Sequence, residues 1–215
     1  MLLLNRAAIK AEAKEKFKSC YWLCVGVLAV TLLLQGACTA ISATGIGTVV
    51  TLLVTPVLTA GMSFFFLRVY RGENPEFVTL FSGFNNFGHV LGGSMWQMLW
   101  TVLWGFVPVM NVIKYYSYCM TPYILMDQPE IGAKDALKVS MAMTQGHKWD
   151  IFVMQLSFIG WVLLTFCTCG LLGLFYVGPY EYVTMAGYYE KLKGSINVEY
   201  DDTYGADSYN KDYDM

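Results

Sequence analysis

Residues 19–67 read SCYWLCVGVLAVTLLLQGACTAISATGIGTVVTLLVTPVLTAGMSFFFL and contain no Asp, Glu, Lys or Arg. An α-helix needs about 20 apolar residues to cross the hydrocarbon core of a bilayer. This stretch is long enough for two crossings, separated by a polar, glycine-containing break at residues 36–47. A soluble chain could not cover so much apolar surface, and the stretch therefore predicts a membrane protein.

The rest of the chain repeats this pattern, because residues 77–113 and 151–180 also lack Asp, Glu, Lys and Arg. Of the 215 residues, 56% are hydrophobic and 14% are charged, whereas a typical soluble domain is about a quarter charged. We expect an all-α polytopic membrane bundle of six transmembrane helices in three hairpins. The expected spans are residues 20–36, 48–67, 90–106, 110–126, 151–168 and 171–189.

The basic residues fall on one side of these spans. Of the 14 Lys and Arg residues, all except Lys114 lie before the first span, after the last, or in the second and fourth connections. Since segments rich in Lys and Arg stay in the cytoplasm, both termini are predicted to be cytoplasmic. The net charge of −2 provides no basic surface for a phosphate backbone, so nucleic acid is excluded as a partner.

Short motifs recur along the chain at nearly constant offsets. Pro75-Glu76 recurs as Pro129-Glu130, Gly88-His89 as Gly146-His147, and Thr121-Pro122 as Gly178-Pro179. Pro56 occupies the corresponding part of the second span, although the first hairpin fits the pattern more loosely. The offsets favour a helical hairpin repeated three times in one orientation, with coincidence as the alternative.

Two amphipathic segments precede hairpins. Their expected apolar stripes contain Ala7, Ala8, Ala11 and Phe17 in residues 5–18, and Ala133, Ala136, Leu137, Ser140 and Met141 in residues 132–144. Such helices lie at the membrane interface, with Lys and Arg near the headgroups. We interpret them as structural elbows, with lipid sensing as the alternative.

Glu181 is the leading candidate for a functional residue, because it lies near the middle of the sixth span. A carboxylate at this depth is costly and faces the bundle interior, water or a counter-ion. Lys114, in the fourth span, either extends its side chain to the interface or pairs with Glu181. Tyr115, Tyr118 and Tyr180 complete a candidate intramembrane polar site, since buried tyrosine hydroxyls need partners.

Other reactive side chains form no recognisable catalytic set. His89, His147 and Trp149 are expected at the interface, and two lone histidines do not make a metal site. The six cysteines are interpreted mostly as small buried residues. No phosphate-binding loop, metalloprotease motif or nucleophile–base set is present. We predict no metal, no cofactor and no enzymatic activity.

The final segment differs from the rest. Residues 195–215 carry acidic residues interleaved with tyrosines and are predicted to be a disordered cytoplasmic tail. Residues 1–194 form the predicted membrane domain. Besides the lipid bilayer, the expected partner is a membrane or cytosolic protein that contacts the tail or the elbow helices, with an inert tail as the alternative.

Several motifs together resemble a family of bacterial integral membrane proteins known as domain of unknown function nine-seventy-five. They are LFSGFNNFG at 80–88, PYIL at 122–125, ALKVSM at 136–141, GHKW at 146–149 and LSFIGW at 156–161. The resemblance extends from about Asn5 to Lys193 and implies a multi-pass protein of the bacterial cytoplasmic membrane. It supplies no reaction or catalytic residue, and Glu181 replaces a neutral polar residue that the family usually carries.

These observations leave two classes of function. The first is a non-enzymatic scaffold or accessory subunit in an envelope or transport process. The second is a small transporter or channel for a solute, ion or lipid that uses Glu181 and Lys114. A water-accessible path to Glu181 would favour transport, whereas a dry, packed interior would favour the scaffold.

Overall fold

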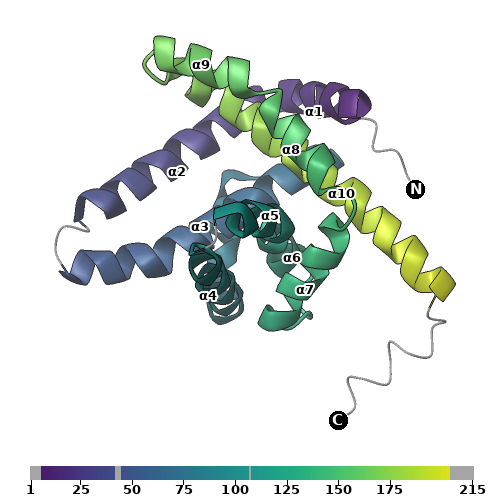
Figure 1. Cartoon of the computed structure of the whole chain (residues 1–215). Helices are drawn as coiled ribbons and strands as arrows, with labels where there is room; N and C mark the ends of the chain where they lie inside the picture. The colour runs from purple at the N-terminus through teal and green to yellow at the C-terminus, as the bar shows by residue number, and fades with distance from the viewer. Residues whose placement is uncertain (1–5, 42–44, 107, 204–215) are drawn as a thin grey trace.

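The computed structural model describes residues 6–41, 45–106 and 108–203, and all regular structure in these residues is helical. The elements, in chain order, are α1 (Arg6–Ser19), α2 (Tyr21–Ile41), α3 (Gly45–Arg71), the 3-10 helix η1 (Phe77–Phe84), α4 (Phe87–Trp104), α5 (Pro108–Tyr118), α6 (Thr121–Asp127), α7 (Ala133–Thr144), α8 (Lys148–Leu156), α9 (Ile159–Cys167), the π-helix η2 (Gly173–Val177) and α10 (Gly178–Thr203) (Figure 1).

The all-helical prediction is confirmed for the described residues. Three segments are long and apolar enough to cross a membrane, namely Tyr21–Ile41, Gly47–Arg71 and Lys148–Cys167. They correspond to the first, second and fifth expected spans. Figure 1 shows α2 and α3 as a hairpin whose closed end points away from both chain termini.

The fourth, fifth and sixth expected spans are not continuous α-helices. The fourth divides into α5 and α6 immediately before Pro122, whose ring displaces the carbonyl of Tyr118 and which has no N–H to donate. The fifth divides into α8 and α9 at Ser157, whose hydroxyl bonds back to the Met154 carbonyl. The sixth begins as η2 and becomes α-helical at Gly178, next to Pro179.

The elbow helices pack against protein. In α1 the buried residues are Ile9, Ala13 and Phe17, whereas Ala7, Ala8 and Ala11 are exposed, so the expected apolar face is correct only at Phe17. The larger side chains decide which face is buried, because they remove more apolar area from water. For α7, the expected stripe is correct at Ala136, Leu137 and Ser140, which are buried, whereas Ala133 and Met141 are only half-buried.

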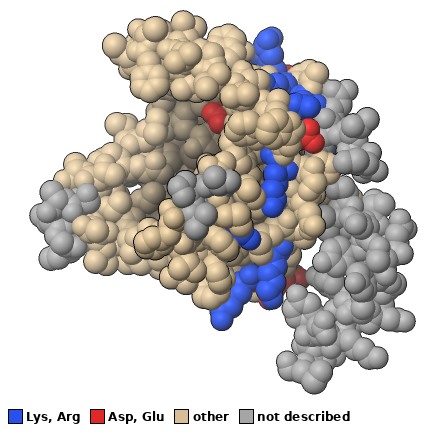
Figure 2. Space-filling model, in the orientation of Figure 1, with Lys and Arg blue, Asp and Glu red and all other residues tan. Residues whose placement is uncertain are grey.

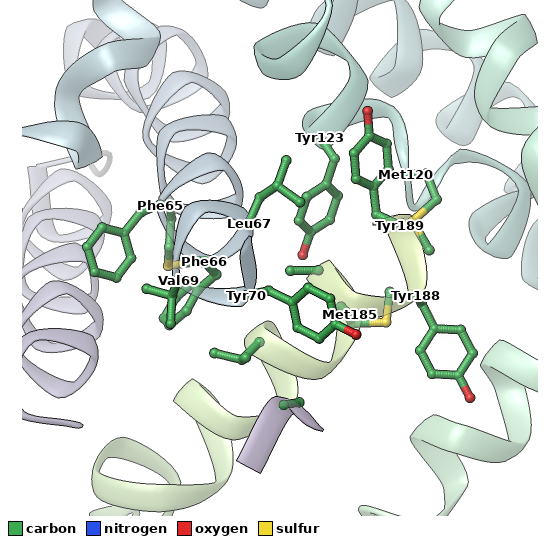
Figure 3. Close-up of a cluster of buried hydrophobic side chains, with 14 of the residues drawn as sticks. Phe65, Phe66, Leu67, Val69, Tyr70, Met120, Tyr123, Met185, Tyr188 and Tyr189 are labelled. Carbon is green, nitrogen blue, oxygen red and sulfur yellow. The ribbon is translucent and has the colours of Figure 1, made fainter. Parts of the chain in front are cut away.

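The core lies where α1, α3, α6 and α10 meet (Figure 3). Phe65, Phe66 and Tyr70 from α3 pack with Tyr123 from α6 and with the α10 residues Met185, Tyr188 and Tyr189. A Cβ atom on Gly187 would lie 2.6 Å from the Tyr70 ring and 3.0 Å from Ile9. Glycine there allows α10 to approach α3 and α1 closely.

The ends of the hairpins are apolar and unburied, in contrast to this core. No residue of α9 is buried, and Leu163 and Phe166 are among its most exposed side chains. Figure 2 shows Lys and Arg as a band across the molecule, with no Lys or Arg on the described surface to one side of it. Polar and apolar surfaces are therefore separated along one direction, as a membrane requires.

α10 continues through Thr203, past the boundary expected at residue 195. Extending an existing helix costs far less than starting one, which explains why the polar residues that follow Gly194 remain helical. Residues 204–215 of the predicted tail lie outside the described residues.

Candidate functional site

Glu181 occupies the first turn of α10, directly after η2. Its side chain is half-buried, and no hydrogen bond or ion pair reaches it from the described residues. Tyr115, Tyr116 and Tyr182 lie within electrostatic range of its carboxylate. Glu181 is therefore a partly accessible carboxylate among tyrosines, without a fixed partner.

Lys114 does not neutralise Glu181 in the described residues. Its ammonium lies 5.2 Å from the centre of the Trp104 ring and 6.0 Å from that of Tyr118. Both aromatic faces attract the cation. These rings stabilise the Lys114 ammonium without a carboxylate partner. Of the two predicted arrangements, this contact agrees with the one in which Lys114 does not pair with Glu181.

The three predicted tyrosines have different surroundings. Tyr115 is exposed and packs edge-on against Tyr116, with 5.5 Å between ring centres. Tyr118 is buried, and the hydroxyl of Tyr180 donates to the Lys10 carbonyl at 3.2 Å. Only Tyr115 of the three interacts electrostatically with Glu181, whereas Tyr180 attaches α10 to α1.

A second carboxylate, Asp127 at the end of α6, is fully engaged. The guanidinium of Arg71 donates from Nη1 to Oδ1 at 2.7 Å and from Nη2 to Oδ2 at 3.0 Å. Lys193 Nζ and the Tyr189 hydroxyl donate to Oδ2 at 2.6 and 3.0 Å. The Asp127 side chain is only 7% exposed. We call Arg71, Asp127, Tyr189, Glu190 and Lys193 the charged junction.

The charged junction joins the last turns of α3 and α6 to α10. Arg71 also reaches Glu190, with 3.0 Å from Nε to Oε2, so one guanidinium bridges two carboxylates. Burial alone would raise the pKa of Asp127, but the hydrogen bonds and charges of Arg71 and Lys193 outweigh it and lower this pKa to about 2. The same carboxylates raise the pKa of Arg71 despite its burial. Asp127 and Arg71 are therefore both ionised at physiological pH.

A stacked pair of aromatic rings has one member near each of the two carboxylates. Tyr123 lies within electrostatic range of Glu181 and stacks on Tyr189, with ring centres 5.4 Å apart. Tyr189 in turn donates to Asp127. Figure 3 shows Tyr123 and Tyr189 next to each other between α6 and α10. Tyr123 thus lies within electrostatic range of Glu181 and packs directly on Tyr189 of the charged junction.

α1 is held against this assembly by polar contacts as well as by its apolar face. The Tyr70 hydroxyl donates to Glu12 at 2.8 Å, and Lys191 lies 3.7 Å from the same carboxylate. Burial, followed by the hydrogen bond to Glu12, raises the pKa of Tyr70. Lys10 donates to the hydroxyl of Ser157 at the α8–α9 break. α1 therefore connects the first and third hairpins.

The residues expected at the interface differ from one another. His147 Nδ1 lies 3.5 Å from Asp150 Oδ2, because the turn that begins α8 brings the two side chains together. The buried Nε2 of His89 has no hydrogen-bond partner among the described residues. Trp149 is 70% exposed. In the described part of the chain, no three His, Cys, Asp or Glu side chains are placed to share a metal ion.

Sequence reasoning missed the charged junction because Arg71, Asp127 and Lys193 resemble ordinary charges that flank a span. A signal was nevertheless present. Each residue follows the second helix of a hairpin, at the same stage of the repeat, and the charges are of both signs. Equivalent positions in parallel repeats converge at one level, where opposite charges can pair.

Residues 106–195 match the model of the family described as "Protein of unknown function (DUF975)". The resemblance seen in the motifs is confirmed for this segment, which runs from the end of the third expected span into α10. The match starts far later than Asn5, so the expected coverage of nearly the whole chain is not reached. No curated protein and no solved structure is significantly similar to the chain.

Proposed function

We propose that this protein is a non-enzymatic membrane scaffold or accessory subunit of an envelope or transport process in the bacterial cytoplasmic membrane. The observation that carries the proposal is the contrast between the charged junction, which locks three hairpins together at one end, and the unburied apolar hairpin ends. The charged junction holds the helices together, while the exposed apolar hairpin ends provide surface for contact with other membrane components, as a scaffold requires.

The proposal places six spans in the bilayer. They are α2, α3, α4, α5 with α6, α8 with α9, and η2 with the first part of α10. The band of Lys and Arg in Figure 2 then lies at the cytoplasmic surface, and both termini are cytoplasmic. The break between α5 and α6 is buried at Met120 and Thr121, and a membrane tolerates non-helical backbone where it is buried in protein.

Reporter fusions test this topology. A reporter that is active only outside the cytoplasm should be inactive when fused after residue 203 and active when inserted at residue 170, in the connection between α9 and η2. Activity of the reporter after residue 203, with the N-terminus still in the cytoplasm, would require an odd number of spans and would contradict the proposal.

The scaffold role is tested by photo-crosslinking in native membranes. A photoreactive residue at Phe166, which is 79% exposed on α9, should give one protein adduct of constant mass. The matched control is Phe158 at the start of the same segment, which is buried and should give only internal crosslinks. Adducts with lipid alone at Phe166, and at Leu163 as a second position, would contradict the proposal.

The alternative is a small transporter or channel, and it is favoured by Glu181, which has no ion-pair partner in the described part of the chain. A half-buried carboxylate without a counter-ion can exchange a proton or hold a cation. Figure 2 shows a hollow on the side of the molecule that has no Lys or Arg, with acidic atoms at its edge. In proteoliposomes, a proton or cation flux that Glu181→Gln abolishes, and that the exposed Glu130→Gln leaves intact, would establish transport. Absence of flux in the unaltered protein would exclude it.

A further inference from the structure

A cavity of about 640 Å³ opens between the last turns of α3 and η1, away from the charged junction. Its volume lies within the range of small-molecule sites, about 300–1,000 Å³. The lining combines the charged side chains Arg68 and Glu76, the polar Asn74 and Asn85, and the aromatic Phe64 and Phe81. None of these residues belongs to the proposed transport or scaffold surface.

The walls of the cavity are fixed by backbone contact. A Cβ atom on Gly61 of α3 would lie 2.0 Å from the carbonyl oxygen of Leu80 in η1, and one on Gly83 would lie 2.7 Å from that of Val57. Only glycine permits this approach. Since η1 and α3 touch through their main chains, the cavity is formed before any ligand arrives, which lowers the cost of binding.

Arg68 is placed to bind a phosphate. Its Nε pairs with Glu73 at 3.2 Å, and its guanidinium carbon lies 5.0 Å from the centre of the Phe64 ring. The ion pair uses Nε, so both terminal nitrogens remain as donors, in the fork geometry that suits phosphate oxygens. The side chain is 42% exposed and can be reached by a ligand.

The charges around the cavity cancel. Glu76 lines it, Glu73 pairs with Arg68, and the Lys16 ammonium approaches Gly72 beside it. Two basic and two acidic side chains give no net attraction for an anionic ligand. The free carboxylate of Glu76 can instead accept hydrogen bonds from an ammonium group. The preferred ligand therefore carries both a phosphate and an ammonium.

Apolar surface continues from the cavity. Phe77, Phe81, Phe84 and Phe87 form a row with 6.1 to 6.4 Å between successive ring centres, and each ring is more than a third exposed. Phe is typical of the apolar face of helices that lie in the membrane interface, where it enters the boundary between headgroups and acyl chains. Arg68 is the first charge after the second expected span, which puts the cavity at headgroup depth.

We propose that this cavity binds the headgroup of an aminophospholipid, such as phosphatidylethanolamine, from the cytoplasmic leaflet. The phosphate lies on Arg68, the ammonium on Glu76, and the acyl chains along the phenylalanine row. The inference rests on the membrane placement proposed above.

Lipid exchange between nanodiscs, or native mass spectrometry from detergent, tests this binding with three probes. Phosphatidylethanolamine should bind more tightly than phosphatidylcholine, which has the same net charge but no N–H donors, and more tightly than phosphatidylglycerol, which has no ammonium. Arg68→Gln should weaken phosphatidylethanolamine binding by about tenfold or more, the usual value of a hydrogen bond to a charged group. Glu76→Gln should remove the preference over phosphatidylcholine while retaining binding.

Arg6→Gln is the matched control, because Arg6 is 43% exposed and pairs with Asp150 at a site remote from the cavity. It should leave lipid preference unchanged. Asn85→Trp, at an exposed position on the rim, should block binding without disturbing the core. Equal binding of the three lipids, or tighter binding of phosphatidylglycerol, would overturn the proposal. Loss of the protein from the membrane fraction would instead contradict the membrane placement.

Discussion

Two carboxylates of this protein, Asp127 and Glu181, have opposite surroundings. Asp127 receives four hydrogen bonds from Arg71, Lys193 and Tyr189. Glu181 receives none from the described residues, and its neighbours are aromatic rings. Asp127 lies in α6 and Glu181 in α10, and both helices return from a hairpin end towards the charged junction.

The difference shows how one bundle can contain a structural charge and a reactive one. A carboxylate with all its lone pairs occupied is locked in its ionised form, and removing it leaves its cationic partners unpaired. A carboxylate without partners contributes little to stability and is available to a proton or cation. We therefore expect Asp127 to determine stability and Glu181 to determine any activity.

Replacing Asp127 by Ala should produce the largest effect. The change leaves Arg71 and Lys193 partly buried and without their shared counter-ion, which costs about 3–5 kcal/mol of unfolding free energy. Denaturant unfolding in detergent measures the loss. The control is Asp135→Ala, because the Asp135–Lys138 pair is mostly exposed and contributes little. Equal losses for the two variants would contradict a stabilising junction.

The stability of the protein should also fall in acid, and Asp127 should be a main cause. Its pKa is lowered from 3.8 to about 2 in the folded state. The unfolded state therefore takes up the proton first, so the stabilisation is complete above about pH 4 and is lost as the pH falls towards 2. The loss amounts to about 2 kcal/mol. Asp127→Asn should show a flatter pH dependence of unfolding than the unaltered protein, and parallel curves would contradict this assignment.

A single hydrogen bond of the junction can be removed with Tyr189→Phe. Because this hydroxyl donates to an ionised carboxylate, its loss should cost about 1.5 kcal/mol. Tyr188 supplies the matched control, since its buried hydroxyl has no partner among the described residues. Tyr188→Phe should be neutral or stabilising in the same thermal unfolding assay. A larger loss for Tyr188→Phe than for Tyr189→Phe would reverse the comparison.

The sequence predicted the helical class and most segment positions, because uncharged stretches and their charged boundaries follow directly from the cost of burying charge. It did not predict the breaks before Pro122 and at Ser157, where local backbone chemistry interrupts a continuous apolar pattern. The face of α1 was also wrong in part, because Ile9 was overlooked as a core residue.

Of the candidate site, too, the sequence identified one part and missed another. Glu181 was identifiable because a carboxylate in an apolar stretch is unusual by itself. The charged junction was not, because Arg71 and Asp127 are 56 positions apart and each is unremarkable alone. Only the packing of α3 and α6 against α10 shows that they meet. The opposite signs at equivalent positions of the repeat were the one available clue.

The smallest expected effect concerns Glu181 and Lys114. Since Lys114 lies over Trp104 and no ion pair joins it to Glu181, the two side chains should contribute independently to stability. Glu181→Gln should change the free energy of unfolding by less than about 0.5 kcal/mol, because it removes a charge but no contact. Lys114→Met should lose only its cation–π contact, about 0.5–1 kcal/mol.

The change in the free energy of unfolding of the double variant should equal the sum of the two single changes within about 0.5 kcal/mol. A double change that is clearly milder than this sum would mean that the two charges pair in the membrane, and Glu181 would then resemble Asp127 as a structural charge.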